Sequence, residues 1–541
     1  MTLDAKGFGL SEALLALRRD RLVRPSFSGY WIEREAPHGW KVVDQVKVLG
    51  GRIELMIDPA GLRHRYFLHP WEHTSERETQ FKLAMAIAQV RSQPPREFKG
   101  GEVELKAHVQ SVVRSLYPSS EKNLEFLDAV IRNTLGLGAL EVLLRDPRVE
   151  DVYIDAPCQH TRAYLTLNQA GPGHVFGRCE TNLIVSENEM NGLVSRLKHR
   201  SGRPFSRSSP VLETDLGDSQ VRATALCPPL SPEGLALALR RRSDTPWTLL
   251  RLANYGAMDE VAAGLLSFLV DGRASILVCG ARGSGKSSLL SSLLFEFPMN
   301  QRILVIEDTR EVPVRALQSM GFKVQSMLVE PTPGMDRAEA AEEALRVSLR
   351  LGESAIVVGE VRGREAMTLY ESMRTGKAGS SVLGTIHGDG AREVHDRVVN
   401  ELGIPAASFA STDVIVTMGL MRPGGGLGQV RLVTEVAEVV RTEGGLDFRP
   451  MLTYHDGYHL SQRVMPLIER ISAGWGMSYE EGLENLRLRI ALRRLLLEMG
   501  QEDPAYLSPS SVVAANEFLW QRPSMSCEEA VSEFSSFVRG R

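Results

Sequence analysis

The sequence predicts an α/β protein in which a parallel sheet with flanking helices follows a smaller α/β domain and precedes a mostly helical C-terminal region. The main observation is a set of apolar, β-rich runs, most of them separated by helix-like segments, at residues 275–280, 302–308, 354–360, 381–387 and 412–418. Strands that alternate with helices in this way are typical of a parallel sheet wrapped by helices. The length of 541 residues suggests about two to four domains.

The smaller α/β domain is expected upstream of these runs, ending near Arg242. A helix is predicted at about residues 119–135, after the turn-rich stretch 92–101. From Asp146 onward the pattern changes to short strand-like runs, which read VEDVYI, RAYLTL, TNLIV and QVRATAL. Residues 187–199 are expected to form a helix among them, and the segment SGRPFSRSSPVLE is loop-like.

The C-terminal part begins with a glycine-rich turn, RPGGGLGQ at residues 422–429, before a strand-like run over 430–440. The rest is expected to be helical. Ser478 and Glu481 form an S-x-x-E capping box, and apolar residues follow on one helix face, namely Leu483, Leu486 and Ile490.

Composition limits the class of protein. The formal net charge of -4 does not indicate a chain-wide basic surface for nucleic acid. The five cysteines are scattered without a CxxC pair, so neither structural zinc nor a disulfide framework is expected. We find no signal-peptide pattern and no apolar run of the roughly 20 residues that a spanning helix needs. Residues 10–24 could form an amphipathic helix, either on a membrane surface or packed on its own domain.

The strongest chemical motif is GARGSGKS at residues 280–287, which fits G-x-x-x-x-G-K-[ST] and lies between a strand-like and a helix-like segment. Its glycines let backbone N–H groups face phosphate oxygens, at the positive end of a helix. Lys286 is expected to reach the β- and γ-phosphates, and Ser287 to ligate Mg²⁺. The predicted ligands are therefore ATP and Mg²⁺. The predicted nucleotide-binding residues here are Gly280, Arg282, Gly283, Ser284, Gly285, Lys286, Ser287 and Ser288.

Glu360 ends the run SAIVVGE and is the candidate carboxylate for the metal. Burying a carboxylate after four apolar residues is costly unless a positive group such as Mg²⁺ and its waters lies beside it. The alternative is a strand-end carboxylate that faces solvent.

Two further strand ends carry polar candidates. Glu307, Asp308 and Glu311 cluster after RILVI, where a carboxylate could orient the attacking water or the water shell of the metal. His387 follows another apolar strand, and a single histidine in that position is more often structural.

Four motifs in this order resemble the type II/IV secretion and type IV pilus assembly ATPase family. GARGSGKSS resembles its Walker A motif, VIEDTREV its Asp box, LRVSLRLGESAIVVGEVRGREA its Walker B region and TGKAGSSVLGTIHGDGAREVHDRVV its His box. Upstream, DPRVEDVYI, SGRPFS, QVRAT, ALRRR and TPWTLLRL resemble the N-terminal domain of the family. GTIHG, DRVVNELGIP and TDVIV resemble the archaeal branch most.

The resemblance implies a RecA-like P-loop motor that works as a homohexamer on the cytoplasmic face of the membrane. ATP lies between the two domains, and domain motion acts on a polytopic inner-membrane platform protein and, through it, on pilin-like or secreted subunits. The chain would then be a cytoplasmic, peripheral membrane protein that needs no nucleic acid. By the same resemblance Glu360 is the Walker B carboxylate, Glu307 or Glu311 polarises the water and His387 senses the γ-phosphate. Arginine fingers would come from Arg222, Arg240 or Arg241.

The resemblance implies four parts of the chain. Residues 1–115 form a partner-specific region, and residues 116–242 form the N-terminal α/β domain. Residues 243–440 form the motor domain, and residues 441–541 form a mostly helical region. The chain departs from the family at Lys377, where a histidine is usual, and it lacks the cysteine-rich zinc element of many bacterial members. The alternatives are a DNA-translocating or DNA-uptake ring, an archaellum motor, and a scaffold with a relic P-loop. The last reading requires a lost lysine or carboxylate, whereas Lys286, Ser287 and Glu360 are all present.

Overall fold

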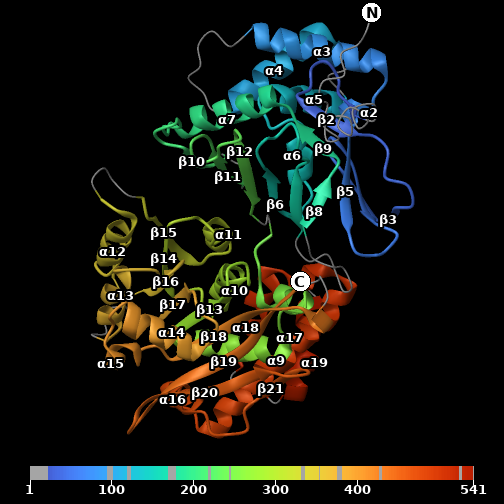
Figure 1. The fold of residues 1–541 in the computed structure, drawn as a ribbon. Coiled ribbons are helices and arrows are strands. Elements are labelled where there is room, and N and C mark those ends of the chain that lie inside the picture. Colours follow the sequence, from blue (N-terminus) through green and yellow to red (C-terminus); the bar gives the residue numbers. More distant parts are fainter. Residues whose placement is uncertain are drawn as a thin grey trace, which may run out of the picture. The chain divides into compact units, whose positions relative to one another are not determined.

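The computed structural model divides the chain into two units, unit 1 (Met1–Asp244) and unit 2 (Thr245–Arg541) (Figure 1). The structure describes residues 22–93, 102–118, 123–167, 178–216, 221–242, 245–330, 335–352, 354–374, 381–425, 429–522, 525 and 527–539. Most of the segment in which an amphipathic N-terminal helix is predicted, residues 10–21, and Lys377 lie outside these ranges. Residues 22 and 23 belong to a strand, so that predicted helix does not extend to residue 24.

Unit 1 is built on a large, mainly antiparallel sheet in which only β5 and β8 pair in parallel within the described residues. Its strands, in spatial order, are β10 (Val211–Asp215), β11 (Val221–Leu226), β12 (Ala236–Arg241), β6 (Val149–Ile154), β7 (Tyr164–Leu167), β8 (Arg178–Thr181), β5 (His64–Pro70), β4 (Gly51–Ile57) and β3 (Lys41–Val48). A small sheet adds β1 (Leu22–Val23), β2 (Tyr30–Glu33) and β9 (Leu183–Val185). The predicted strands of this region are confirmed as β6, β7, β9 and β11, and β1–β5, β8, β10 and β12 are additional. The prediction of a loop over SGRPFSRSSPVLE is wrong at its end, where β10 pairs with β11 and Leu212 enters the core.

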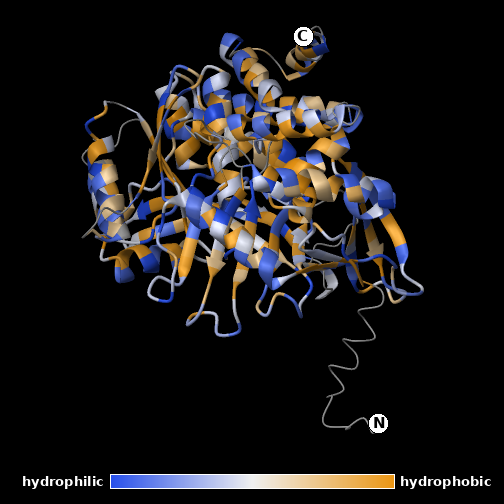
Figure 2. Cartoon of the chain, turned by 90° about the horizontal axis from the view of Figure 1, so that it is seen from above, coloured by the Kyte–Doolittle hydropathy of each residue, from blue (hydrophilic) through white to orange (hydrophobic). Residues whose placement is uncertain are grey.

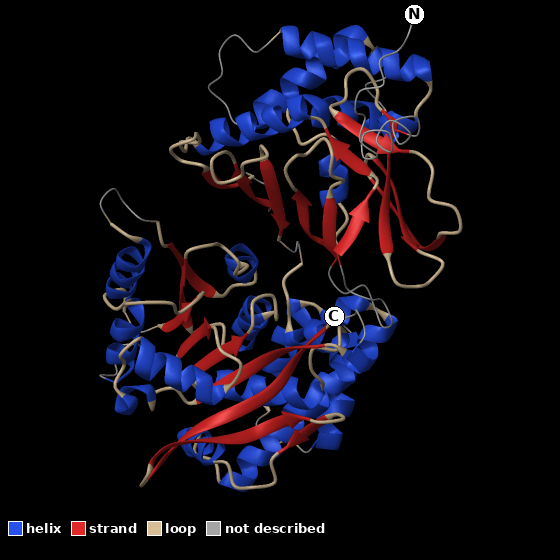
Figure 3. Ribbon diagram, in the orientation of Figure 1, coloured by secondary structure: helices blue, strands red, loops and turns tan. Residues whose placement is uncertain are grey.

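The helices of unit 1 gather on one side of the large sheet (Figure 3). They are α2 (Trp71–Thr74), α3 (Arg77–Ser92), α4 (Glu102–Leu116), α5 (Leu124–Thr134), α6 (Ala139–Leu144) and α7 (Glu187–Ser201). The predicted helix at 187–199 corresponds to α7. Ser186 caps its start by accepting the N–H of Glu189, and Gly202 ends it with φ +64°. The helix predicted at 119–135 corresponds to α5, with residues 119–122 outside the described ranges.

In the described part of unit 2 the strands form one nine-stranded sheet. Six parallel strands come first, namely β15 (Lys323–Leu328), β14 (Arg302–Glu307), β16 (Ala355–Val358), β17 (Val382–Ile386), β13 (Ile276–Gly280) and β18 (Val414–Met421). Three antiparallel strands extend it, namely β19 (Val430–Thr442), β20 (Gly445–Tyr454) and β21 (Tyr458–Leu460). The five predicted strands of the parallel sheet and the strand predicted at 430–440 are confirmed, and β15 is additional. The expectation that the residues after 440 are helical is wrong for β20 and β21, because a turn at 443–444 folds the chain back beside β19 and helices begin only at Pro466.

Helices cover both faces of this sheet, and each face has its own core. Along β13, Ile276 and Val278 belong to one core, whereas Leu277 and Cys279 belong to the other. Successive side chains of a strand point to opposite faces, which explains why the whole run is apolar. Orange and blue alternate along the helices in Figure 2, as expected for elements that bury one side only. The helices are α8 (Leu249–Asn254), α9 (Glu260–Asp271), α10 (Lys286–Leu293), α11 (Val314–Ser319), α12 (Arg337–Ser348), α13 (Glu365–Arg374), α14 (Ala391–Asp396), α15 (Ala406–Phe409), α16 (Pro466–Gly474), α17 (Tyr479–Glu502), α18 (Pro509–Gln521) and α19 (Cys527–Arg539).

The C-terminal helices pack on the P-loop domain within unit 2. The capping box predicted at Ser478 starts α17: the Ser478 hydroxyl accepts the N–H of Glu481, and the Glu481 carboxylate accepts the N–H of Ser478. α17 then packs against α9. The buried Arg493 donates to Glu296 at 2.7 Å and to the Ser267 hydroxyl at 2.8 Å. No helix in the described ranges combines the length and the hydropathy that crossing a bilayer requires.

Candidate nucleotide site

The motifs meet at one edge of the sheet of unit 2. The parallel strands β14, β16, β17 and β13 are neighbours in that order, so their carboxyl ends lie side by side (Figure 1). β13 leads into the 280–287 loop, β14 ends at Glu307, and Glu360 and His387 lie just beyond β16 and β17. Ligands of open α/β sheets bind at this edge. The order of strands therefore brings together motifs that are up to about a hundred residues apart in sequence.

The 280–287 loop has the backbone that its glycines predict. Gly280, Gly283 and Gly285 have φ values of +148°, +80° and +97°. A side chain at Gly280 would place its Cβ 2.3 Å from the carbonyl oxygen of Met418, so only glycine fits there without a shift. α10 starts at Lys286, so the last two residues of the loop motif are also the first two of the helix. The loop thus presents the N-terminus of a helix at the sheet edge, which favours an anion.

Lys286 lies inside this loop. Its ammonium is buried, and it donates to the carbonyl oxygens of Gly280 and Ala281, both at 2.9 Å. Burial lowers the pKa of Lys286, and the charges of Glu360 and Glu311 act in the opposite direction. Those two carboxylates therefore lie near enough to the ammonium to affect it. The hydroxyl of Ser284, in the same loop, is buried and has no hydrogen-bond partner in the described part of the chain.

Glu307 and Glu311, the two Asp-box candidates, have different environments. Glu307 is buried at the end of β14, and its Oε1 accepts the backbone N–H groups of Glu311 and Val312, each at 2.9 Å. It therefore fixes the turn that follows the strand. Glu311 lies on that turn, and its side chain is exposed and acts electrostatically on Lys286. This difference in burial favours the exposed Glu311 as the carboxylate that faces a ligand. It favours Glu307 as the residue that holds the turn in position.

Glu360 is held between its neighbouring strands. The N–H of Gly359 donates to the carbonyl of Ile306 in β14 at 2.8 Å, and the Thr385 hydroxyl of β17 donates to the carbonyl of Gly359 at 2.6 Å. The Glu360 side chain is 16% exposed. Nε2 of His387 lies 2.9 Å from its Oε1, an ion-pair distance, although the ring is not aligned for a hydrogen bond. The structure thus brings His387 to the candidate metal carboxylate.

Arg362 is a member of this cluster that the sequence analysis did not single out. Its guanidinium pairs with Oε2 of Glu360 and lies 3.4 Å from Oδ2 of Asp308. Its backbone N–H donates to the buried Glu365 at 2.6 Å. The signal was available in the segment GEVRGRE, because a carboxylate that is largely buried requires a cation, and Arg362 is two residues away.

The three candidate arginine fingers lie in unit 1. Arg222 of β11 and Arg240 of β12 are directly opposite each other in the antiparallel register. Arg222 pairs with Glu213 at 3.0 Å and Arg240 with Asp151 at 2.9 Å. Arg241 donates to the carbonyl of Pro147 at 3.3 Å. Their role toward a nucleotide remains a prediction.

Comparison with known proteins identifies the family. A family model described as "Type II/IV secretion system protein" matches residues 212–439. A putative conjugal transfer protein of Mycobacterium tuberculosis is 31% identical over 268 residues, which cover 49% of this chain and 72% of that protein. The chain belongs to the type II/IV secretion system ATPase family. Members are P-loop ATPases, in agreement with the resemblance stated above.

Two archaeal relatives agree with the resemblance to the archaeal branch. Both are uncharacterized proteins of Methanocaldococcus jannaschii. One is 33% identical over 255 residues, which cover 45% of this chain and 33% of that protein. The other is 26% identical over 338 residues, which cover 62% of this chain and 58% of that protein. This secretion-family chain therefore spans between one third and three fifths of the length of these two relatives. Among solved structures, the pilus retraction motor PilT with bound ADP is 16% identical with a TM-score of 0.38, covering 64% of this chain and 90% of PilT.

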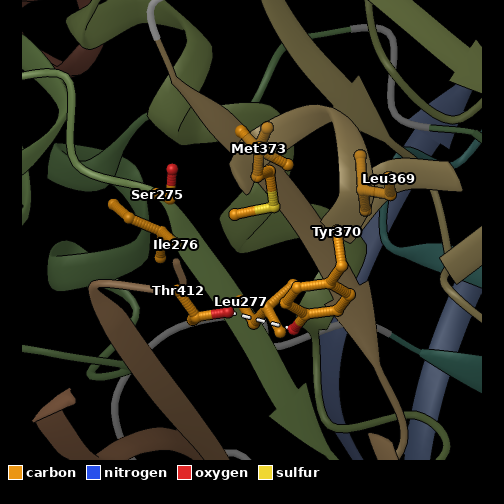
Figure 4. Close-up of a pocket in the computed structure, with 8 residues that line it drawn as sticks. Ser275, Ile276, Leu277, Leu369, Tyr370, Met373 and Thr412 are labelled. Atoms are coloured by element: carbon orange, nitrogen blue, oxygen red, sulfur yellow. Dashed lines mark hydrogen bonds between the residues drawn. The ribbon is translucent and has the colours of Figure 1, made fainter. Parts of the chain in front are cut away.

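The sheet edge of this ATPase-family chain also borders a cavity of about 230 Å³, with Asp308, Glu360 and Arg362 at its polar side and apolar residues of α12, α13, β14 and β16 around the rest. A second cleft, around Tyr370, lies near the start of β13. It has no room for a water molecule, and the Tyr370 hydroxyl is 3.0 Å from that of Thr412 (Figure 4). The second cleft is thus part of the packed core.

The residues at the sheet edge fit Mg²⁺. The hydroxyl of Ser287 and the carboxylate of Glu360 are hard oxygen ligands of the kind that Mg²⁺ prefers, alongside waters and nucleotide phosphates. Across the described ranges no group of three or more His, Cys, Asp or Glu side chains could hold a metal ion by itself. Any Mg²⁺ here would therefore depend on phosphate oxygens to complete its ligands, which is its usual behaviour at nucleotide sites.

Proposed function

We propose that this chain hydrolyses ATP with Mg²⁺ and serves as the motor of a pilus-assembly or secretion machine. The observation that supports this most is the convergence of Lys286, Glu311, Glu360 and His387 on one sheet edge, beside a glycine loop that leads into a helix. An ammonium, a metal carboxylate and a further exposed carboxylate are the parts that phosphoryl transfer to water requires. A relic P-loop would be expected to lack one of them.

Each side chain has a role in this proposal. Lys286 exchanges its two carbonyl partners for phosphate oxygens when ATP binds, because charge-assisted hydrogen bonds to phosphate are stronger than those to carbonyls. Ser287 and Glu360 hold the metal, which when bound neutralises charge that develops on the phosphates. Glu311 orients the attacking water, and Glu307 holds the turn that carries Glu311. His387, beside Glu360, responds when the γ-phosphate leaves.

The motor is proposed to act as a homohexamer at the cytoplasmic face of the membrane, where it pushes on a polytopic platform protein. Pilin-like or secreted subunits would be moved indirectly. Arg222, Arg240 and Arg241 are the candidates for arginine fingers, because they lie together at the ends of β11 and β12. An archaellum would use the same motor chemistry.

A second candidate is a motor for DNA transfer. Relatives from Mycobacterium tuberculosis and from Rhizobium radiobacter are named as conjugal transfer proteins. The formal net charge of -4 argues against a DNA grip by this chain. Binding to single- or double-stranded DNA that falls with salt would favour the second candidate.

The direct test uses the wild-type protein. Phosphate release from ATP is measured with Mg²⁺ and with EDTA, and sedimentation is measured with and without a non-hydrolysable ATP analogue. We expect release only with Mg²⁺ and a hexamer that the analogue favours. Metal-independent release, or a monomer in every nucleotide state, would contradict the proposal.

A further inference from the structure

Arg362 has a distinctive position at the end of the sheet. One guanidinium bridges two carboxylates from adjacent strand ends, Asp308 after β14 and Glu360 after β16. Glu360 is the carboxylate assigned above to the metal. Arg362 is therefore a cation that the chain itself supplies to Oε2 of this carboxylate, while the His387 ring lies 2.9 Å from Oε1. Its side chain is 53% exposed, so it lies at the surface of the site and not in the core.

The backbone that carries Arg362 is fixed. The buried Glu365 accepts the N–H groups of Arg362 and Gly363 at 2.6 and 2.8 Å. The preceding residue, Val361, is buried and donates to the carbonyl of Thr385 at 2.8 Å. The turn therefore stays in place while the half-exposed Arg362 side chain can change its partner by rotation alone.

Mg²⁺ and the guanidinium compete for Glu360. Two cations that share one carboxylate repel each other, and Mg²⁺ carries twice the charge of the guanidinium. Magnesium also gives up its water reluctantly and gains most when phosphate oxygens join the protein ligands. Free Mg²⁺ therefore has to displace an ion pair that is already formed, whereas Mg²⁺ that arrives on a nucleotide brings additional ligands with it.

We propose that Arg362 is an internal counter-cation that keeps free Mg²⁺ from Glu360 before nucleotide binds and is displaced from Glu360 by Mg²⁺–nucleotide. This inference rests on the proposed function, because it assumes that Glu360 is the metal carboxylate. It adds a form of regulation: the site takes up its metal together with nucleotide and not before. The freed guanidinium then becomes available to an anionic group of the nucleotide.

The test measures Mg²⁺ binding to the nucleotide-free, full-length protein, by the rise in melting temperature and by calorimetry. In Arg362→Gln the half-saturating concentration of Mg²⁺ is expected to fall at least about tenfold, or about 1.4 kcal/mol, because the competing charge is gone. The melting temperature without Mg²⁺ is expected to fall slightly. The matched control is Arg364→Gln, in the same turn, whose side chain is 71% exposed and reaches only to 4.0 Å from Glu339. We expect wild-type Mg²⁺ binding from it.

Two further variants guard against a folding defect. Glu360→Gln combined with Arg362→Gln removes both charges, so the melting temperature should return toward that of the wild type. The tighter Mg²⁺ binding expected of Arg362→Gln alone should be lost. If Arg362→Gln does not fold, Arg362→Lys replaces it. One ammonium cannot bridge two carboxylates as a guanidinium does, so half-saturation should still fall, about threefold. Unchanged Mg²⁺ binding in the folded variant overturns the inference.

The measurement also separates this inference from the proposed function. A wild-type protein that binds no fluorescent ATP analogue with Mg²⁺ present refutes the nucleotide site itself. A protein that binds the analogue, and whose Arg362→Gln variant takes up free Mg²⁺ no better than the wild type, refutes only the role of Arg362.

Discussion

Two clusters of arginines and carboxylates, one in each unit, differ in burial, and the difference indicates what each is for. In unit 1, Arg132 and Glu72 both have side chains with 0% exposure. Arg132 donates to both oxygens of Glu72, at 3.0 and 2.9 Å, and to Asp128 at 2.7 Å. In unit 2, the Arg362 guanidinium that joins Glu360 and Asp308 is half exposed.

The cluster in unit 1 is closed. All three nitrogen atoms of the Arg132 guanidinium donate, and Arg145 pairs with the second oxygen of Asp128 at 2.6 Å. Burial acts to raise the pKa of Glu72, but Arg132 outweighs it and holds the pKa below its usual range. The cluster joins α2 to α5 and leaves no side for a ligand. The cluster in unit 2 is open, because the Arg362 side chain is half exposed and can be reached by a ligand. Its charged groups can therefore exchange partners. We infer that the first stabilises the fold and the second serves binding.

The largest expected effect is on the closed cluster. Arg132→Met leaves the buried Glu72 without its arginine, and Asp128 with Arg145 alone, and should destabilise unit 1 by about 3–5 kcal/mol. The control is Arg52→Met, which removes an arginine 51% exposed and 3.2 Å from Glu54, and it should cost less than about 1 kcal/mol. Calorimetry of both variants measures the difference. A similar loss of stability in the two variants would show that burial does not decide how much an ion pair contributes to stability.

Lys286→Ala comes next and tests the other unit. The variant loses the ammonium that faces the phosphates, so ATP hydrolysis should fall at least about a hundredfold, or about 2.7 kcal/mol. Lys323→Ala removes an exposed lysine at the start of β15 and should keep the wild-type rate. Phosphate release per folded molecule is the measurement. A Lys286→Ala protein that hydrolyses ATP at the wild-type rate would rule out the loop as the phosphate site.

The two Asp-box glutamates allow the same comparison within one turn. Glu307→Gln weakens two charge-assisted hydrogen bonds, one buried and one partly buried, and should lower the stability of unit 2 by about 2 kcal/mol. Glu311→Gln, on the exposed side, should leave the melting temperature unchanged and slow turnover at least about tenfold. Each variant is the control for the other. The reverse result, a slow but stable Glu307→Gln and an active Glu311→Gln, would exchange the two roles.

Much of unit 2 could be predicted because its signals are local. A strand buried on both faces is apolar throughout, as in β13, and a phosphate loop needs its glycines in sequence. β12 was harder to predict because only two of its side chains, Leu237 and Leu239, give an alternating apolar pattern before three arginines follow. β3 was missed because most of its residues are exposed, so polar residues interrupt the pattern.

Most members of the candidate site, with the exception of Arg362, could be named from the sequence, but their pairings could not. The motifs named Lys286, Glu360 and His387, yet no local pattern says that Glu307 binds its own turn or that Arg362 reaches Asp308. The contact between Arg362 and Asp308 depends on the register of β14 beside β16, which joins residues about 50 apart in sequence. Side-chain partners across a parallel sheet are set by tertiary structure.

The measurement that tests the central claim most directly compares ATP binding and ATP hydrolysis in Glu360→Gln. The substitution keeps the size of the side chain and removes the charge that is proposed to hold the metal. An interaction made mainly in the transition state affects turnover and leaves ground-state binding nearly intact. We predict that the variant binds ATP as the wild type does and hydrolyses it at least about tenfold more slowly, or about 1.4 kcal/mol of barrier. Hydrolysis by Glu360→Gln at the wild-type rate would contradict the assignment of the metal carboxylate.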